Sequence, residues 1–470
     1  MAGYNALKVT GYESGLVTKR EEFLLPNDAY PILQNAYVWR ERILRKKGYE
    51  LLGRLQRNVA TTDGAGNAVI NITPLPIQPG IAFFTVGTNL FTDPGGASPG
   101  VLLTSGPGTA TLDRATGVLT IVGSNANTLV QYYPGLPVMG ICTRELTRSA
   151  NDETIFFDQN YAYVYDQALM AFKEFITTPP NTWNASGKDV TGTDFFWSTN
   201  YWVSALFLPT LPPNTIPFFT TTDKKLFWVT NNTGAYGALA GSPVDPIRIT
   251  DGTTWVDFTF PNYGQIDATK FLLQCLSFLP FRGRMVAFNT WEGANYGALT
   301  NYSNRIRWAT VGNPFIKYNN GTPGVTPAQG SWRDDIRGQG GFLDIPTSED
   351  IVSVGFVRDN LVIYCERSTW QLRYTGRTIS PFQIEKVNSE LGGKGPLSAV
   401  QFDTSLVGIG DKGIVECDSY KSERIDIKIP DFVFDFQAET VANNASYRIH
   451  GVRDFINRLA YWTIPLASSY

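Results

Sequence analysis

The segment Phe281-Arg-Gly-Arg-Met-Val-Ala-Phe288 contains the pattern that decides the fold: an apolar residue, three mostly polar or small residues, and a short apolar and aromatic run. The pattern recurs five more times, at residues 157–164, 222–229, 357–364, 402–409 and 455–462. Each copy is typical of a turn that leads into a buried strand. The copies start 45 to 76 residues apart, and a four-stranded propeller blade needs about 45–50 residues.

The repeat therefore predicts an all-β fold, a propeller-like ring of about six blades with a small inserted β domain. Where the copies start more than about 50 residues apart, we expect long loops between the strands, notably in the Gly- and Pro-containing stretch 310–346. Because a polar turn before an apolar strand occurs in any antiparallel sheet, an arrangement of several sandwiches remains the alternative. Helical periodicity is nearly absent, and residues 168–175 are the best helix candidate.

Composition divides the chain into four parts. Residues 1–22 form an N-terminal arm, and residues 23–56 contain the first β hairpins of the propeller. Residues 57–137 are rich in Gly, Thr, Ala, Asn and Pro and are predicted to be the inserted β domain, with a hairpin at 109–121. Residues 138–470 form the propeller-like body.

The overall composition excludes several classes of protein. The chain has 470 residues, 13% of them aromatic, and 17% charged, against about 25% charged in an average domain. The formal net charge is −3, so the chain lacks the global positive charge that drives tight, salt-dependent binding of nucleic acid. Any contact with DNA has to be local or weak.

Cysteine and histidine limit the possible chemistry. Cys142, Cys275, Cys365 and Cys417 lie too far apart for a CxxC metal or redox motif, and we expect them to be reduced and buried. His450 is the only histidine, so a zinc site with several histidines is excluded, and a catalytic triad would have to use this residue. We expect no catalytic residue, no cofactor site and no metal site.

No targeting or membrane segment is expected. The start, MAGYNALKVTGYESG, lacks the basic and apolar regions of a signal peptide. The most apolar window, 201–219, contains four prolines, so no stretch reaches the roughly 18 apolar residues of a membrane helix.

Five basic residues lie within a stretch of eight, which makes them candidates for an interface or for phosphate contacts. They are Arg40, Arg42, Arg45, Lys46 and Lys47. If a single strand alternates there, Arg40 and Arg42 share a face that could meet phosphates or an acidic neighbouring protein. The alternative is a solvated edge strand that its charges protect from aggregation.

Three further motifs resemble functional sites but favour a structural interpretation. Asp334 and Asp335 lie in the loop 332–338 and could serve a glycosidase, but a solvated loop with local ion pairs is the favoured interpretation. The glycines at 392–395 do not match a phosphate-binding loop, so a turn is favoured. His450 has no Ser or Cys nucleophile motif nearby and is expected to be structural.

Several strings together resemble one protein family. Residues 23–39, Phe-Leu-Leu-Pro-Asn-Asp-Ala-Tyr-Pro-Ile-Leu-Gln-Asn-Ala-Tyr-Val-Trp, followed by Gly48-Tyr-Glu-Leu-Leu-Gly-Arg54, resemble the opening of the tail hub or nozzle proteins of short-tailed bacteriophages, also labelled packaged-DNA stabilisation proteins. Further similar strings lie at 133–141, 304–309, 312–314, 340–349, 366–370 and 390–415. The resemblance covers 23–57 and 133–465, and a crAss-like phage is a plausible source.

The resemblance implies a propeller-based structural subunit of the virion tail, assembled in the cytoplasm of the bacterial host. Its partners would be copies of itself in a closed ring, expected to be a hexamer, and the portal-proximal and tip-proximal tail proteins. The ring would line the channel for transient passage of genomic DNA and help to retain it. Relatives continue beyond the end of this chain, so an incomplete last blade is expected.

Two other functions remain open from the residues. A virion-associated propeller glycosidase would use Asp334 or Asp335. A glycan-binding module would expose aromatic side chains such as Tyr201, Trp202 and Trp255 in grooves.

Overall fold

The structure of the protein is a computed structural model that describes most of the chain. The described residues are 15–16, 29–30, 36–39, 42–45, 55–72, 77, 83–133, 138–146, 152–158, 160–166, 171–183, 195–203, 224–231, 245–258, 263–321, 328–427, 449–456 and 459–463. They fall into two compact units, one of Met1–Leu51 with Ser348–Tyr470 and the other of Leu52–Thr347.

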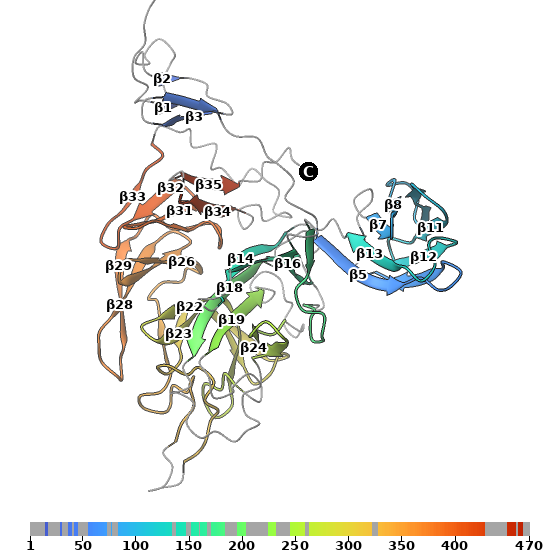
Figure 1. Ribbon diagram of the computed structural model, residues 1–470. Coiled ribbons are helices and arrows are strands. Elements are labelled where there is room, and N and C mark those ends of the chain that lie inside the picture. Colours follow the sequence, from blue (N-terminus) through green and yellow to red (C-terminus); the bar gives the residue numbers. More distant parts are fainter. Residues whose placement is uncertain are drawn as a thin grey trace, which may run out of the picture. The chain divides into compact units, whose positions relative to one another are not determined.

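Every regular element in the described ranges is a β-strand, which confirms the all-β prediction (Figure 1). The helix expected at 168–175 is wrong in its described part, because Ala171–Glu174 is strand β17 and pairs with the preceding strand. In β17 the adjacent Ala171 and Phe172 are both buried, while Lys173 is exposed.

The insert consists of two small sheets around its own core. One contains β6 (Ala68–Asn71), β12 (Val118–Val122), β11 (Thr109–Leu112) and β9 (Gly100–Val101), in that order. The other contains β10 (Leu103–Thr104), β8 (Asn89–Thr92), β7 (Phe83–Val86), β13 (Leu129–Tyr133) and β5 (Leu55–Thr61). Phe84, Phe91, Leu119 and Tyr132 are among the buried residues of this core. The antiparallel pairing of β11 with β12 confirms the predicted hairpin.

Strand β5 joins the insert to the body. It pairs antiparallel with β13 and, through Leu55 and Gln56, parallel with β17. The sheet therefore continues through β17, β16 (Ala162–Asp166), β15 (Glu153–Phe157) and β14 (Gly140–Arg144), which follow one another as antiparallel neighbours.

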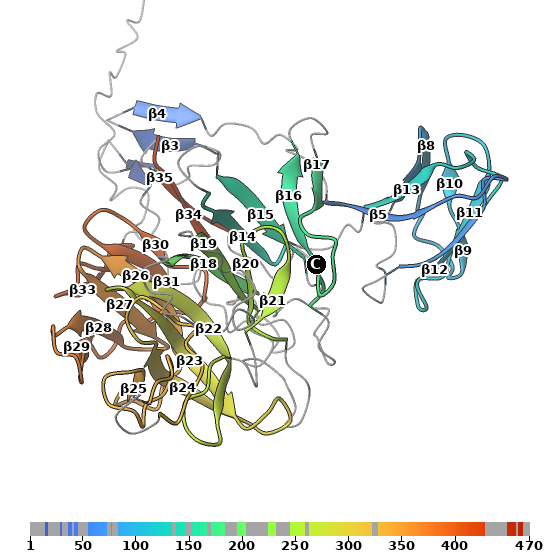
Figure 2. The ribbon, with the colours of Figure 1, turned by 60° about the horizontal axis from the view of Figure 1, so that its bottom comes forward.

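Two four-stranded antiparallel sheets complete the unit Leu52–Thr347. The first contains β18 (Phe196–Val203), β19 (Lys224–Asn231), β20 (Arg248–Thr250) and β21 (Trp255–Asp257). The second contains β22 (Phe271–Phe281), β23 (Arg284–Gly293), β24 (Leu299–Trp308) and β25 (Gly341–Asp344). Each strand pairs with the next along the chain, as Figure 2 shows for β22 to β25.

The other unit repeats the same arrangement. Its four-stranded sheets are β26 (Ile351–Val357), β27 (Asn360–Cys365), β28 (Thr369–Tyr374), β29 (Phe382–Asn388), and β30 (Val400–Gln401), β31 (Leu406–Gly410), β32 (Gly413–Cys417), β33 (Ser422–Arg424). Three two-stranded sheets are β34 (His450–Asp454) with β35 (Leu459–Thr463), β3 (Ala36–Trp39) with β4 (Arg42–Arg45), and β1 (Gly15–Leu16) with β2 (Ala29–Tyr30).

The sequence repeat marks the start of these sheets. The copies at 281, 357, 402 and 455 are turns between the first and second strands, and the copy at 222 leads into the second strand of its sheet. At 281–284 the turn residues Arg282 and Gly283 both have positive φ, at 51° and 72°, which suits a tight two-residue hairpin. The first copy departs from this order, since it joins β15 to β16, one strand later.

Burial decreases from the first to the last strand in two of the sheets, β22–β25 and β26–β29. Strands β22, β23, β26 and β27 are almost wholly buried, whereas β25 and β29 consist mostly of half-buried and exposed residues. Within each unit the first strands of successive sheets lie against one another: β14 against β18 and β18 against β22, then β26 against β30 and β30 against β34.

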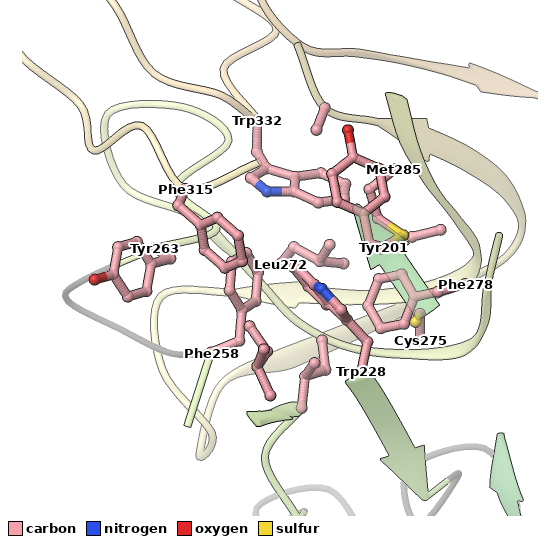
Figure 3. Packing of buried hydrophobic residues seen from close by; sticks show 14 of the residues in the cluster. Tyr201, Trp228, Phe258, Tyr263, Leu272, Cys275, Phe278, Met285, Phe315 and Trp332 are labelled. Atoms are coloured by element: carbon pink, nitrogen blue, oxygen red, sulfur yellow. The ribbon is translucent and has the colours of Figure 1, made fainter. Parts of the chain in front are cut away.

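The largest core cluster lies in the unit Leu52–Thr347, between sheets β18–β21 and β22–β25 (Figure 3). Trp228 is its centre, with the rings of Phe258, Phe278 and Phe315 at centroid distances of 5.0, 5.5 and 5.2 Å. Trp332, from the long connection between β24 and β25, closes the cluster and donates its indole N–H to the carbonyl oxygen of Pro314.

Candidate functional site

The basic cluster of the N-terminal region is only partly described. Arg40, Lys46 and Lys47 lie outside the described residues, while Arg45 is exposed at the end of β4. β3 ends at Trp39 and β4 begins at Arg42, and these two residues pair across the hairpin. Alternation along a single strand therefore does not relate Arg40 to Arg42, and that part of the sequence argument was wrong.

A buried network of arginines and carboxylates is the most elaborate polar site of the described residues. Arg305 and Arg307 lie two residues apart on β24, so they share a face. Glu292 of β23 accepts two hydrogen bonds from Arg307, at 2.7 and 3.0 Å, and one from Arg305 at 3.0 Å. Thr290 adds a hydroxyl donor at 2.8 Å. Glu292 and Arg307 are almost completely buried.

Arg305 carries the network to the outer strand of the sheet. It donates two hydrogen bonds to Asp344 of β25, at 2.7 and 2.8 Å. Its guanidinium lies 3.8 Å from the ring centre of Tyr302 and 4.1 Å from that of Phe342, within the range of cation–π attraction. Burial acts to lower the pKa of Arg305, but the hydrogen bonds and charges of Asp344 and Glu292 outweigh it and raise that pKa.

The loop 332–338 is bound to the same network. Asp334 accepts a hydrogen bond from Arg307 at 3.0 Å, and Asp335 accepts two from Arg333, one of 2.6 Å. The predicted local ion pair is thus Arg333–Asp335. The loop is not simply solvated, however, because Trp332 and Arg333 are buried. The neighbouring carboxylates of Asp334 and Asp335 are thus bound by different arginines, Arg307 and Arg333. These charge-assisted hydrogen bonds restrict the movement of the loop.

Sequence reasoning selected the two aspartates and missed Glu292, Arg305 and Arg307. The available signal was Asn304-Arg-Ile-Arg-Trp308, in which two arginines alternate with Ile306 and Trp308 and therefore share one face of the strand. Since an arginine is almost never fully buried without a partner, two of them in a core strand indicate a buried acid nearby.

The aromatic residues proposed for glycan binding do not form an exposed groove. Tyr201 and Trp255 are only 4% and 2% exposed, whereas Trp202 is 50% exposed. Tyr201 belongs to the core cluster of Figure 3, and alternation along β18 turns its neighbour Trp202 to the other side. The expectation was therefore wrong for two of the three residues.

A cavity of about 320 Å³ lies in the unit that contains β26–β33, and it includes part of the glycine stretch. Charged residues of both signs line it: Glu366, Arg367, Glu390, Asp411 and Lys412. Lys394 pairs with Asp411 at 2.6 Å, and Lys412 lies 3.6 Å from Glu390.

Close backbone packing explains the glycines beside this cavity. A Cβ at Gly392 would lie 2.3 Å from the carbonyl oxygen of Cys365, and one at Gly410 would lie 2.4 Å from that of Gly392. No helix begins at 392–395, as predicted, and the stretch serves the approach of two chain segments.

The cysteines are structural thiols rather than a reactive site. All four cysteines are free, as expected; three are buried, and Cys142 is half-buried. Burial raises the pKa of Cys142 to about 12 and that of Cys417 to about 11, so both are protonated thiols at neutral pH.

Within the described ranges no cluster of His, Cys, Asp and Glu side chains is arranged to hold a metal ion. Among the same residues, no helix has the length and apolar character of a membrane span.

His450 is expected to give a pH dependence of stability. It is half-buried at the start of β34, opposite Thr463, and burial lowers its pKa from the ordinary 6.5. Below pH 6.5 the unfolded chain binds the proton first, so stability falls as the pH drops from 6.5 toward the lower folded pKa. Urea unfolding between pH 5 and 7 should show a loss in the wild type that His450→Gln lacks; equal pH slopes in both proteins would contradict this.

Comparisons with known proteins identify no family. No protein-family model matches the chain, and no curated protein matches it in sequence. One similar solved structure is the extracellular domain of a protein described as a one-component system from B. thetaiotaomicron, with 12% identity, a TM-score of 0.25, and coverage of 62% of this chain and 34% of that one. Another is apo AztD from Citrobacter koseri, with 10% identity, a TM-score of 0.29, and coverage of 73% and 93%. The chain spans about a third of the first of these structures, and likeness at these scores supports no argument about function.

Proposed function

We propose that this chain is a structural subunit of the tail of a short-tailed bacteriophage, a hub or nozzle protein. Copies would assemble in the bacterial cytoplasm into a closed ring, expected to be a hexamer, that lines the DNA-ejection channel and helps to retain the packaged genome. The sequence strings from residue 23 onward support this family. The portal-proximal and tip-proximal tail proteins would be its neighbours.

A six-bladed propeller is the architecture proposed for the body. Its blades would be β14–β17, β18–β21, β22–β25, β26–β29, β30–β33, and a last one that combines β34–β35 with the hairpin β3–β4. Support comes from the contacts between the first strands of successive sheets within each unit and, in β22–β25 and β26–β29, from the decrease of burial toward the last strand. A lone two-stranded hairpin is marginally stable, and both hairpins belong to the same compact unit.

One observation carries the proposal of a structural role: the charged groups that sequence analysis singled out at 332–338 are used for internal ion pairs. Asp334 binds Arg307 and Asp335 binds Arg333, while Glu292 is held by two arginines. Such a network fixes the position of a loop on a sheet, which suits a protein that acts through its shape.

The charge balance suits a channel through which DNA has to slide. Many lysine or arginine contacts to phosphates would release counterions and bind the polyanion tightly. A net charge of −3 on 470 residues avoids this. We therefore expect only weak, non-specific binding of duplex DNA by the assembled protein.

Electron microscopy of the purified chain at increasing concentration tests the proposal. Closed rings of uniform subunit number are expected, and the same rings should be located in the tail of virions by subunit-specific labelling. A monodisperse monomer at all concentrations, together with no labelling of particles, would reject the structural role.

Fluorescence anisotropy with labelled duplex DNA at 50 and 200 mM salt should show weak binding at both salt concentrations.

A further inference from the structure

Residues 316–319 and 328–331 form the stem of a loop between β24 and β25. The stem begins next to Phe315 and returns at Trp332, and both of these rings belong to the core cluster of Figure 3. Two hydrogen bonds join the base of the stem. The N–H of Ser331 donates to the carbonyl oxygen of Ile316 at 2.9 Å, and the N–H of Ile316 donates to the Ser331 hydroxyl at 2.8 Å. The stem is therefore tied to the core of its unit.

An isolated antiparallel bridge between Asn319 and Gln329 ends the stem. The N–H of Asn319 donates to the carbonyl oxygen of Gln329, and the N–H of Gln329 donates to the side-chain oxygen of Asn319, both at 2.9 Å. The next two residues, Asn320 and Gly321, lie outside any regular element, and Asn320 is exposed. In the described part of the chain no hydrogen bond involves either of them. The Asn320 side chain is thus open to water, directly beyond the last anchored residue.

The pair Asn320-Gly321 is chemically distinctive, because no other asparagine in the sequence is followed by glycine. Glycine has no Cβ beside its backbone nitrogen, so this nitrogen can approach the carbon of the preceding side-chain amide. Gly321 has a φ of 66°, in the left-handed region that residues with a Cβ rarely adopt. The backbone thus favours glycine at this position, and the glycine leaves the amide before it unprotected.

We propose that Asn320 is a site of spontaneous deamidation, which converts its neutral side-chain amide into a carboxylate. The backbone nitrogen of Gly321 loses its proton, attacks Cγ of Asn320 and forms a new C–N bond. The bond from Cγ to Nδ2 breaks, and the amide nitrogen takes up a proton and leaves as ammonia. A cyclic succinimide remains. Asparagine belongs to the thermolabile residues that are less frequent in proteins of hyperthermophiles.

Water opens the succinimide and completes the reaction. Attack at the side-chain carbonyl gives aspartate with an ordinary backbone, and attack at the backbone carbonyl gives isoaspartate, in which the chain runs through the side chain. The overall reaction consumes one water and releases one ammonia, and it needs no oxidant or reductant. Either product adds one negative charge, which changes the formal net charge of the chain from −3 to −4.

Exposure alone does not select the site, as Asn295 shows. Asn295 is also exposed, between β23 and β24. Its side-chain oxygen accepts a hydrogen bond from the N–H of Gly297 at 2.9 Å, which restrains the amide. The residue that follows is Tyr296, whose Cβ hinders the approach of its nitrogen. We therefore expect Asn295 to stay intact under conditions in which Asn320 reacts.

The reaction is expected to leave the fold intact. Position 320 is exposed and lies beyond the bridge of Asn319 with Gln329, and surface substitutions of this kind change stability little. An aged preparation should therefore contain two folded forms that differ by one charge. The inference does not depend on the proposed role in a phage tail, because the reaction needs only this loop and water.

Incubation of the purified full chain at pH 6 and at pH 8.5, followed by anion-exchange chromatography, tests the inference. A later-eluting form with one additional negative charge should accumulate, and faster at pH 8.5, because the attacking nitrogen has to lose its proton. Asn320→Asp should elute at the position of this form from the start and unfold at the same urea concentration as the wild type. Peptide mapping by mass spectrometry should locate aspartate and isoaspartate at position 320.

Two matched variants make the result decisive. Asn320→Gln should not produce the additional form, because its longer side chain would have to close a larger and less favourable ring. Asn295→Gln should produce the form at the wild-type rate. The inference is overturned if no such form appears at pH 8.5, if Asn320→Gln produces it equally fast, or if the peptide map places the change at another residue.

Discussion

Arg307→Leu is expected to lower the free energy of unfolding by about 3–5 kcal/mol, the cost of breaking a buried ion pair from one side. Arg307 makes two hydrogen bonds to Glu292 and one to Asp334, and both Arg307 and Glu292 are almost completely buried. The variant would leave Glu292 with Arg305 as its remaining cationic partner in the network. Urea-induced unfolding followed by intrinsic fluorescence measures the loss.

The matched control is Arg373→Leu, which breaks an exposed pair on another sheet. Arg373 binds Glu385 at 3.1 Å, and both side chains are largely exposed. Water screens such a pair, so the expected loss is roughly 0.2–1 kcal/mol. Similar small losses for both variants would show that the Arg307 network contributes little to the fold.

Trp228→Ala should be as damaging, through a different mechanism. The indole is completely buried among Phe258, Phe278 and Phe315, and its removal leaves a cavity that these rings cannot fill. The expected loss is about 3–5 kcal/mol. Chemical unfolding measures it, and the milder Trp228→Phe provides a readable value if the alanine variant is not recovered as soluble protein.

Trp202 offers a control in the neighbouring strand. It lies on β18, beside the strand of Trp228, and half of its side chain is exposed. Trp202→Ala is expected to change stability by no more than about 0.5 kcal/mol, as for most surface substitutions. If both tryptophan variants lost the same free energy, the cluster around Trp228 would not be the main core of its unit.

Local sequence patterns were sufficient for several turns and for the strands that follow them, though not for β17, which was expected to be helical. The repeat located the hairpins at 281, 357, 402 and 455 because a polar turn between apolar runs is a local property. The low charge and high Gly and Thr content also set residues 57–137 apart from the rest of the chain in composition. The copy at 157–164 forms the second turn of its sheet and not the first. The repeat could not predict this, because the local sequence of one hairpin in a meander does not differ from that of the next.

The polar network could not be predicted in the same way. Glu292 lies 13 residues from Arg305, and only the register of β23 against β24 brings the two together. Alternation predicts that Tyr201 and Trp202 point to opposite sides, but which side is the core depends on the sheet packed against it. Both facts depend on which strands pair and which sheets pack together. Neither can be derived from a short segment of the sequence.

The discontinuity of one compact unit has a consequence during synthesis. Its N-terminal part ends at Leu51, and its remaining part begins at Ser348. At roughly 5–20 residues per second, a ribosome needs about 15–60 s to make the intervening segment. During that time the early part has no partner from its own chain, whereas neighbouring ribosomes on the same messenger hold nascent chains that can offer one. Exchange of this part between sister chains is therefore the expected error of biogenesis, and slow translation of the middle segment would increase it.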